Sequence, residues 1–282
     1  MVLLSFFRSS AGLNHRQKNK DSGIALMGYV FTYNDAIAWH QRREHPDIRA
    51  QIRMENRLIC RMLNPLKGQS VLDIGCGTGE GLLALSEAGL QVTGLDPSPH
   101  MLEFASRKMG NQADLHRGTA EDLPFDDNSF TYACMVNTLE FTDFPIRALE
   151  EAFRVTKDKV FIGIMNRHSF QSAWLRTVRI FTRNIWSNAV FFTVWEMKRM
   201  TRSLVGNVPF SWRSANLVPI PFGSFFRKSG YFELISKNPL SPFIGITVIP
   251  VPMFRTRPLE LKCRPSPAAG TVAGLARSKR SQ

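Results

Sequence analysis

Two carboxylates near the ends of predicted strands are the side chains of this chain best placed to do chemistry. Asp73 lies in the apolar run 71–74, and the glycine-rich turn 75–79 follows that run directly. Asp96 comes at the end of the next predicted strand, 91–95. The glycines allow the backbone to bend tightly and to approach a ligand closely. A carboxylate beside such a turn repels a pyrophosphate, so the arrangement selects a cationic ligand over a phosphate.

The spacing of the glycines separates this turn from a dinucleotide site. A dinucleotide fingerprint is spaced G-x-G-x-x-G and seats a pyrophosphate on a helix N-terminus, whereas this turn reads G-x-G-x-G and contains no basic residue. Asp96 lies 21 positions after Gly75, the distance at which such folds place a ribose-binding carboxylate. Two carboxylates beside an uncharged turn suit an adenosine with a positively charged amino-acid tail. The expected cofactor is therefore S-adenosylmethionine, as a methyl donor.

Alternating apolar segments predict the elements that position these residues. Strands are expected at 71–74, 91–95, 131–137 and 160–165, and helices at 48–63, 80–88, 101–109 and 145–155. The alternation of strand and helix predicts an α/β fold with a Rossmann-like, doubly wound sheet.

Four ordered motifs give this chain a specific resemblance over roughly residues 70–165. They are 71–79, 94–98 with Met101 and Leu102, 118–125, and 128–130 before a strand. In these motifs the chain resembles the class I S-adenosylmethionine-dependent methyltransferases, in particular the branch of the ubiquinone and menaquinone biosynthesis methyltransferases. The resemblance implies a sheet of about seven strands with an α-helical lid insertion. It also implies a last helix at 222–229 and an antiparallel C-terminal hairpin of 231–236 and 244–251.

The resemblance further implies which residues bind the donor. Asp73 would orient its ammonium group, Asp96 would accept the ribose hydroxyls, and the glycines would let the backbone approach its carboxylate and ribose. The implied set is Asp73, Gly75, Cys76, Gly77, Thr78, Gly79, Asp96, Pro97, Ser98, Thr119, Ala120, Glu121 and Asn137. The family usually has Asp or Asn where this chain has Thr119, so the adenine-amine contact would pass to the neighbouring backbone or to Glu121. Asn137 ends a predicted strand and would face the crevice where open α/β sheets bind ligands.

Methyl transfer is an in-line displacement, and proximity and alignment supply most of its acceleration. A general base is needed only where the acceptor must lose a proton. His168, which follows the strand 160–165, and Tyr33, in the segment before the core, are the two catalytic candidates. Trp39 and His40 belong to the same N-terminal cover as Tyr33, and plain packing or capping is the alternative for each of these residues. No metal site is predicted, because the six histidines lack a helix-spaced carboxylate partner.

The chain carries a net charge of +13, which is divided unevenly. Residues 70–165 hold 15 acidic and 7 basic side chains, whereas residues 1–69 hold 11 basic and 5 acidic and residues 166–282 hold 18 basic and 3 acidic. Basic flanks around an acidic core favour an anionic partner, which could be a lipid headgroup, an acidic small molecule or nucleic acid. The alternative is a solvated basic surface.

These patterns predict six segments. They are a basic disordered extension at 1–26, a helical cover at 27–69, the donor-binding core at 70–165, a basic aromatic lid at 166–213, a C-terminal helix and hairpin at 214–262 and a disordered tail at 263–282. In the lid, aromatic residues such as Phe170 and Trp174 alternate with Arg176, Arg179 and Arg183, which is typical of a basic amphipathic helix. The apolar run near the N-terminus is too short to span a bilayer, and a transit peptide or a start at Met27 is left open. The four cysteines show no paired spacing, which favours free thiols in a reducing compartment.

The sequence therefore predicts an S-adenosylmethionine-dependent methyltransferase acting on a small, hydrophobic or amphipathic acceptor. We expect a cytoplasmic protein with peripheral contact to an anionic membrane surface, or an organellar one if the extension is a transit peptide. Two alternatives stay open: a nucleic-acid or protein methyltransferase, and an inactive S-adenosylmethionine-binding regulator or assembly factor. Nucleic acid is disfavoured because no recognised binding motif accompanies the arginines.

Overall fold

A mixed β-sheet forms the centre of the structure, a computed structural model that describes residues 29–178, 189–216 and 234–250. The strands are β1 Ser70–Ile74, β2 Gln91–Asp96, β3 Ala113–Arg117, β4 Phe130–Val136, β5 Thr156–Met165, β6 Phe210–Asn216, β7 Leu234–Ser236 and β8 Phe243–Val248. Within the described residues they form one eight-stranded sheet in the order β3-β2-β1-β4-β5-β8-β6-β7. The first five strands in this order are parallel to one another, as the βα alternation predicts.

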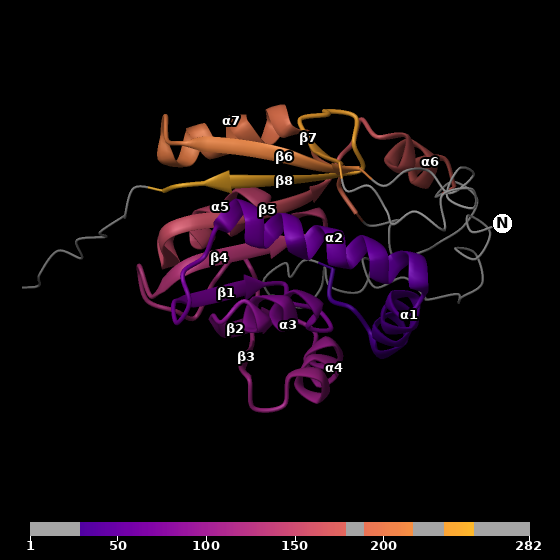
Figure 1. Ribbon diagram of the computed structural model, residues 1–282, viewed down its shortest axis with the longest axis vertical. Helices are drawn as coiled ribbons and strands as arrows, with labels where there is room; N and C mark the ends of the chain where they lie inside the picture. The colour runs from indigo at the N-terminus through magenta and orange to yellow at the C-terminus, as the bar shows by residue number, and fades with distance from the viewer. Residues whose placement is uncertain (1–28, 179–188, 217–233, 251–282) are drawn as a thin grey trace, which may run out of the picture.

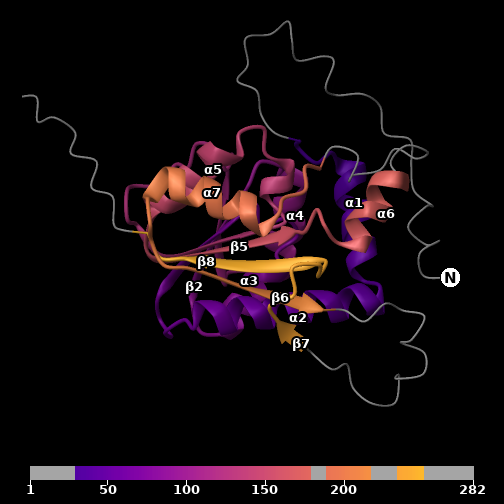
Figure 2. The same ribbon diagram turned by 90° about the horizontal axis from the view of Figure 1, so that it is seen from above.

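Helices cover both faces of this sheet (Figures 1 and 2). They are α1 Tyr33–Arg43, α2 Pro46–Leu63, α3 Glu80–Glu87, α4 Pro99–Met109, the 3-10 turn η2 Leu139–Phe141, α5 Pro145–Val155, α6 Phe170–Val178 and α7 Val194–Val205. Figure 2 shows α5 and α7 above the sheet and α2 below it. One buried apolar cluster joins α5 and α7 to the strands, and a second joins α2 and α3 to the opposite face. The expected doubly wound fold is confirmed.

Local sequence signals explain where several of these helices begin. The Ser98 hydroxyl accepts a hydrogen bond from Met101 N at the start of α4, and Pro99 occupies a position where a helix needs no N–H donor. At the start of α1, Thr32 and Asp35 form a reciprocal capping box. The first turn of each helix is thus fixed beside the carboxyl edge of the sheet.

The antiparallel part of the sheet contains three strands. β8 pairs with β5, and β6 lies between β8 and β7, antiparallel to both. The C-terminal pairing therefore includes β6, which begins within the expected lid 166–213 and extends past its end, and β7 does not pair directly with β8. The helix expected at 222–229 lies outside the described residues.

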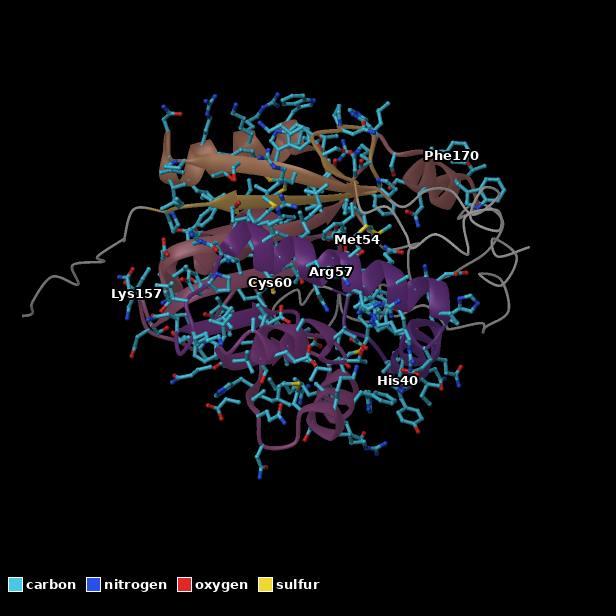
Figure 3. All side chains as sticks on the ribbon, in the orientation of Figure 1. His40, Met54, Arg57, Cys60, Lys157 and Phe170 are labelled. Atoms are coloured by element: carbon cyan, nitrogen blue, oxygen red, sulfur yellow. The ribbon has the colours of Figure 1, made fainter. Side chains whose placement is uncertain are left out.

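The expected lid region divides into different parts in the structure. α7 buries Val194 and Met197 against the core, next to α5, and β6 is a strand of the sheet. α6 lies at the periphery, where Phe170 is 82% exposed (Figure 3). Residues 179–188, which include Arg179 and Arg183, lie outside the described residues. No helix in the described residues is both long and apolar enough to cross a bilayer.

The carboxyl ends of β1, β2 and β4 meet at one edge of the sheet. β1 pairs in parallel with β2 on one side and with β4 on the other. The chain passes from β1 toward β2 and β3 and then returns to β4, so the strand order reverses beside β1. Open α/β sheets bind ligands at such a switch point.

Candidate functional site

The turn after β1 is held against the end of β2. The backbone N–H groups of Gly75 and Cys76 both donate to Leu95 O, at 2.7 and 3.0 Å. A Cβ on Gly75 would lie 2.5 Å from the Thr138 side chain, so only glycine fits there. Gly77, with φ of +53°, has no atom within 4 Å of the position its Cβ would take. The turn therefore presents bare backbone to open space.

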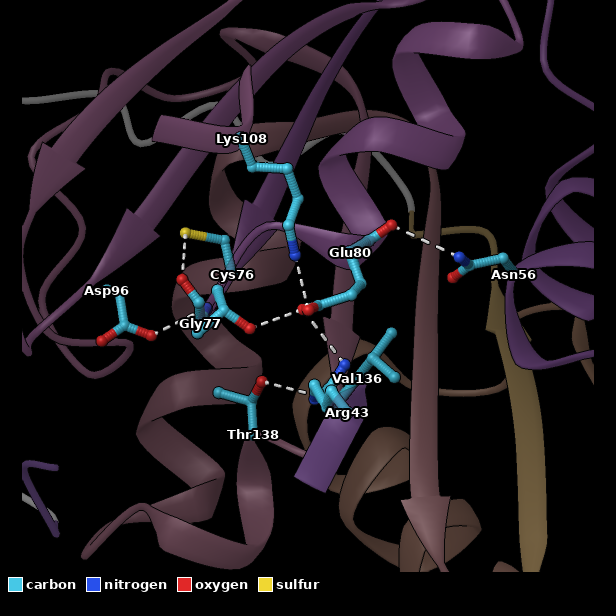
Figure 4. Close-up of polar contacts among 10 residues, drawn as sticks. Arg43, Asn56, Cys76, Gly77, Glu80, Asp96, Lys108, Val136 and Thr138 are labelled. Carbon is cyan, nitrogen blue, oxygen red and sulfur yellow. Dashed lines mark hydrogen bonds and ion pairs between the residues drawn. The ribbon is translucent and has the colours of Figure 1, made fainter. Parts of the chain in front are cut away.

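The two carboxylates predicted from the sequence lie beside this turn. Asp96 is 7% exposed, and its oxygens accept hydrogen bonds from Ser98 N at 2.9 Å and from Gly77 N at 3.0 Å, the latter drawn in Figure 4. Asp73 is 4% exposed, and a Cβ on Gly81 would lie 2.8 Å from its Oδ2. The glycine at 81 thus leaves room for this carboxylate.

Burial dominates the ionisation of both groups. It raises the pKa of Asp73 to about 7, with the nearby Asp96 charge adding to the effect. It raises the pKa of Asp96 to about 6, against the two backbone N–H groups that favour the ionised form. A cation bound between them would lower both pKa values, because an opposite charge favours the ionised carboxylate. The pair is therefore suited to a positively charged ligand.

Glu80, at the start of α3, joins four helices. Its carboxylate contacts Arg43 of α1 at 3.2 Å, Lys108 of α4 at 2.6 Å and the Thr78 hydroxyl at 2.7 Å (Figure 4). Its backbone carbonyl accepts a hydrogen bond from the Asn56 side chain of α2 at 3.3 Å. Burial alone would raise the pKa of Glu80, but Arg43 and Lys108 lower it to about 2. The sequence analysis did not identify this cluster.

A short segment before α1, residues 29–32 and here called the strap, crosses the end of β1. Tyr29 N donates to Phe141 O at 3.0 Å, on the β4 side, and the Ser98 hydroxyl donates to Phe31 O at 2.7 Å, on the β2 side. The Phe31 ring packs edge-on against Trp39 and Phe141, with ring centroids 5.6 and 5.3 Å apart. The strap therefore connects the two rims of the crevice.

A cleft opens beneath the strap, and we call it the first cleft. Of the implied donor-binding residues, those that line it are Asp73, Gly75, Cys76, Gly77, Thr78, Asp96 and Asn137. Phe31, Arg43, Glu55 and Glu80 also line it. Phe31, Arg43 and Glu55 were missed because they meet the predicted residues only through tertiary contacts. Glu80 directly follows the glycine turn, but its ion pairs with Arg43 and Lys108 form only in the folded structure.

The other implied donor residues lie around this cleft. Gly79, with φ of +84°, caps α3, and Pro97 O accepts a hydrogen bond from the Arg117 side chain. Ser98 caps α4 and fastens the strap. Ala120 is 6% exposed within the core.

Two more of them belong to the loop after β3. Thr119 pairs with Asp122 in an isolated bridge, and a Glu121 carboxylate oxygen accepts a hydrogen bond from Asp143 N at 3.1 Å. The loop is thereby held near the first cleft, although neither residue lines it.

Asn137 follows β4 in a left-handed conformation, with φ of +53°. Its backbone N–H donates to Gly163 O at 2.9 Å. Its side-chain Oδ1 is buried and has no hydrogen-bond partner in the described part of the chain. A buried acceptor without a partner costs free energy of folding, about 1–3 kcal/mol, and a ligand in the cleft would satisfy it.

The two catalytic candidates lie outside the first cleft. Tyr33 is 55% exposed at the start of α1, where its ring packs edge-on against His100. His168 is exposed in the turn after β5, and its backbone N–H donates to Asn166 Oδ1 at 3.2 Å. Neither contributes to the lining. His40, of the same cover, stacks on Phe104 with ring centroids 4.6 Å apart.

The residues of the first cleft fit S-adenosylmethionine. Two buried carboxylates are available to a ribose and an ammonium group, the open space beside Gly77 leaves room for a ligand close to the backbone, and the Asn137 oxygen has no partner in the described residues. In the described residues no group of three or more His, Cys, Asp or Glu side chains could hold a metal ion.

Comparison with known proteins agrees with this geometry. Residues 72–163 match the family model described as a methyltransferase domain. A demethylmenaquinone methyltransferase of Staphylococcus epidermidis is 42% identical over 100 residues, which are 34% of this chain and 42% of that protein. The matched segment thus spans less than half of the relative's length.

Solved structures share the fold over a larger part of the chain. An S-adenosylmethionine-dependent methyltransferase of Thermotoga maritima, a possible histamine N-methyltransferase, is 27% identical with a TM-score of 0.59, over 76% of this chain and 95% of that one. Magnesium protoporphyrin IX methyltransferase of Synechocystis, with S-adenosylhomocysteine bound, is 12% identical with a TM-score of 0.52, over 79% and 89% of the two chains, and shares the fold alone.

The fold and the matched residues define the class. Residues 72–163 match the methyltransferase domain family in sequence and have the fold of class I S-adenosylmethionine-dependent methyltransferases, and the cleft beside them fits S-adenosylmethionine.

Proposed function

We propose that this protein transfers a methyl group from S-adenosylmethionine to a small, lipid-like acceptor of the quinone type. The observation that supports S-adenosylmethionine as the donor is the pair of buried carboxylates, Asp73 and Asp96, beside the bare backbone of Gly77. The proposal of a quinone-type acceptor is supported by the demethylmenaquinone methyltransferase relatives. It is also supported by a second cleft that adjoins the first and combines apolar and polar walls.

We assign the donor contacts as follows. Asp96 accepts the ribose hydroxyls, since its two oxygens already have fixed positions through Gly77 N and Ser98 N. Asp73 attracts the ammonium group, and the turn 75–79 approaches the carboxylate. When bound, S-adenosylmethionine supplies a methyl group activated by its positively charged sulfur. The protein holds the groups in line and, with Phe31 and Trp39 over the cleft, excludes water.

Calorimetric titration tests the donor assignment directly. S-adenosylmethionine and S-adenosylhomocysteine should both bind the purified protein, and NAD, as the control ligand, should not. If neither sulfur compound binds, the methyltransferase assignment fails for this chain. Binding of both without transfer to any acceptor would instead favour an S-adenosylmethionine-binding regulator.

Asp96→Asn provides a sharper version of this test. It keeps an oxygen acceptor in the loop but removes the charge, and hydrogen bonds to charged groups contribute about 1.5–3 kcal/mol. We expect the affinity for S-adenosylhomocysteine to fall roughly 10- to 100-fold. Glu87→Asn, at an exposed position on α3, is the matched control and should leave the affinity unchanged. An Asp96→Asn protein that binds as the wild type does would contradict the ribose assignment.

A further inference from the structure

The second cleft shares a wall with the first. Five residues line both clefts: Trp39, Arg43, Ile52, Glu55 and Asn137. The first cleft extends from this wall toward Asp96 and β2, and the second extends toward Gln51 and toward Met165 at the end of β5. A ligand held against Asp73 and Asp96 can therefore react with a molecule in the second cleft only at this shared wall.

Glu55 is the acidic side chain that lines both clefts in the described structure. It lies on α2, is 5% exposed, and its Oε1 accepts a hydrogen bond from the Gln51 side chain at 2.8 Å. Its Oε2 has no hydrogen-bond partner among the described residues. Asn137, which also lines both clefts, has a buried Oδ1 without a hydrogen-bond partner in the described part of the chain. Two polar atoms at the junction are thus left for a ligand.

The position of Glu55 has no evident structural purpose. Its neighbours on α2, Met54, Leu58 and Ile59, are apolar and pack on the sheet. A buried carboxyl whose one hydrogen bond comes from the preceding turn destabilises a fold relative to an apolar side chain of similar size. Residues that lower stability in this way are characteristic of functional sites.

The charges around Glu55 come from four elements. Arg42 and Arg43 of α1 line the second cleft, Asp73 and Glu80 line the first cleft, and Glu140 of η2 interacts electrostatically with Glu55. Burial raises the pKa of Glu55, and the Gln51 hydrogen bond and the Arg43 charge lower it in part. A carboxylate whose pKa is raised is a stronger base than one in water.

We infer that Glu55 is the general base for the acceptor and that the second cleft, with Asn137, holds a hydroxylated aromatic ring. This inference rests on the proposed function. The O–H bond of the ring breaks, and its proton passes to Glu55 Oε2. The electron pair then forms a bond from that oxygen, or from the ring carbon conjugated with it, to the methyl carbon. The methyl–sulfur bond breaks with its electrons left on sulfur; after attack by carbon, the proton on that carbon moves to the oxygen and the ring becomes aromatic again.

The test compares the wild type with Glu55→Gln, and with Glu44→Gln at an exposed position as the matched control. The acceptor is a short-chain demethylmenaquinol, with methyl-labelled S-adenosylmethionine as donor. Glu55→Gln should lower kcat about 100-fold or more, the range of general base catalysis. Its Kd for S-adenosylhomocysteine and its KM for the quinol should change less than about threefold, and its Tm should not fall. Glu55→Asp should recover part of kcat, and Glu44→Gln should behave as the wild type.

Each failure has a separate signature. If the wild type methylates the quinol and Glu55→Gln retains kcat within about threefold, the role of Glu55 is wrong while the function stands. If the wild type binds S-adenosylhomocysteine but neither methylates nor binds the quinol in calorimetry, the acceptor class is wrong, and the role of Glu55 fails with it. If S-adenosylhomocysteine does not bind, the proposed function itself fails. A Glu55→Gln protein with lowered Tm and lowered donor affinity would show a structural role and overturn the inference.

Discussion

The buried carboxylates of the first cleft lower the stability of the empty protein at neutral pH. Burial raises the pKa of Asp73 to about 7 and that of Asp96 to about 6, from an ordinary value of 3.8 for both. At pH values between the unfolded-state pKa and the folded-state pKa of each group, the folded protein binds more protons than the unfolded chain. The free energy of unfolding must then fall as pH rises. Glu140, with a pKa raised to about 7 mainly by burial, acts in the same direction.

This difference predicts how the unliganded protein responds to pH. We expect its Tm to fall as pH rises from about 4 to about 7, the window between the unfolded and folded pKa values of Asp73. Thermal unfolding in matched buffers measures this change, and Asp73→Asn should reduce the slope. Glu80, with its pKa lowered to about 2, acts oppositely and only on the acid side of this window. A Tm that rises through the window would contradict the account.

Asp73→Asn should separate stability from donor binding. The substitution removes a buried charge at pH 8 and preserves the side-chain size, so we expect Tm to rise. It also removes the partner of an ammonium group, so the affinity for S-adenosylhomocysteine should fall about 10- to 100-fold. Differential scanning calorimetry and titration calorimetry give the two quantities. Unchanged affinity in Asp73→Asn would mean that the ammonium group binds elsewhere.

The sequence indicated part of the candidate site at this scale. Asp73, Asp96 and the glycines between them were predicted because a strand end and a turn carry their signal locally, and the structure brings them together with Asn137. Glu55 was read only as part of a helix, because its burial depends on the packing of α2 against the sheet and α1. Where long-range packing places a side chain, a single sequence contains no spacing that reveals it.

At the scale of the elements, a charged contact joins α1 to α3. Arg43, in its last turn, lies over the Trp39 ring at 4.7 Å and pairs with Glu80 of α3, where both side chains are less than one-fifth exposed. This partly buried pair should contribute more to stability than an exposed pair, for which about 0–1 kcal/mol is usual. The docking of α1 over the first cleft therefore depends on Arg43.

Arg43→Ala should loosen α1 without unfolding the sheet. Hydrogen exchange of the α1 amides should become faster, because the helix opens at a lower cost than the rest of the fold. Amides of β1 and β4 should keep their protection. Arg49→Ala, which removes an exposed pair with Glu44, is the control and should leave exchange in α1 unchanged. Equal protection of α1 in both variants would show that aromatic packing, rather than the ion pair, fixes the helix.

The accuracy of the element predictions followed the strength of the local signal. α5 spans Pro145–Val155, the predicted residues, because a proline begins it and its apolar face repeats at helical spacing. No residue range was predicted for β3, since it lies at the sheet edge and many of its residues are exposed and polar. In β6, aromatic residues stand next to Arg213, and the pattern was read as part of a basic lid. Its pairing with β8 and β7 distinguishes it as a strand.

At the scale of the whole molecule, the uneven distribution of charge along the chain predicts that the protein binds an anionic membrane surface. Phe170 and Trp174 of α6 are 82% and 40% exposed, next to a strongly basic part of the sequence. We expect the full chain to bind vesicles containing phosphatidylserine and to dissociate in about 0.5 M salt, since screening removes electrostatic attraction. Sedimentation with vesicles measures the bound fraction.

A pair of variants identifies the surface responsible. Changing Phe170 and Trp174 together to Ser should weaken vesicle binding, whereas Trp195→Ser, at a 57% exposed position on α7, should not. Absent or salt-independent binding by the wild type would mean that the basic flanks serve another purpose.

The strap also imposes an order in time. Its two backbone carbonyl and amide contacts, Phe31 O with Ser98 and Tyr29 N with Phe141, join opposite rims of the crevice above β1. A molecule held below cannot depart along this path until both contacts open, and a fresh one cannot enter until they do. For a molecule that enters and leaves by this path, the frequency of strap opening is an upper limit on turnover, however fast the methyl transfer itself becomes.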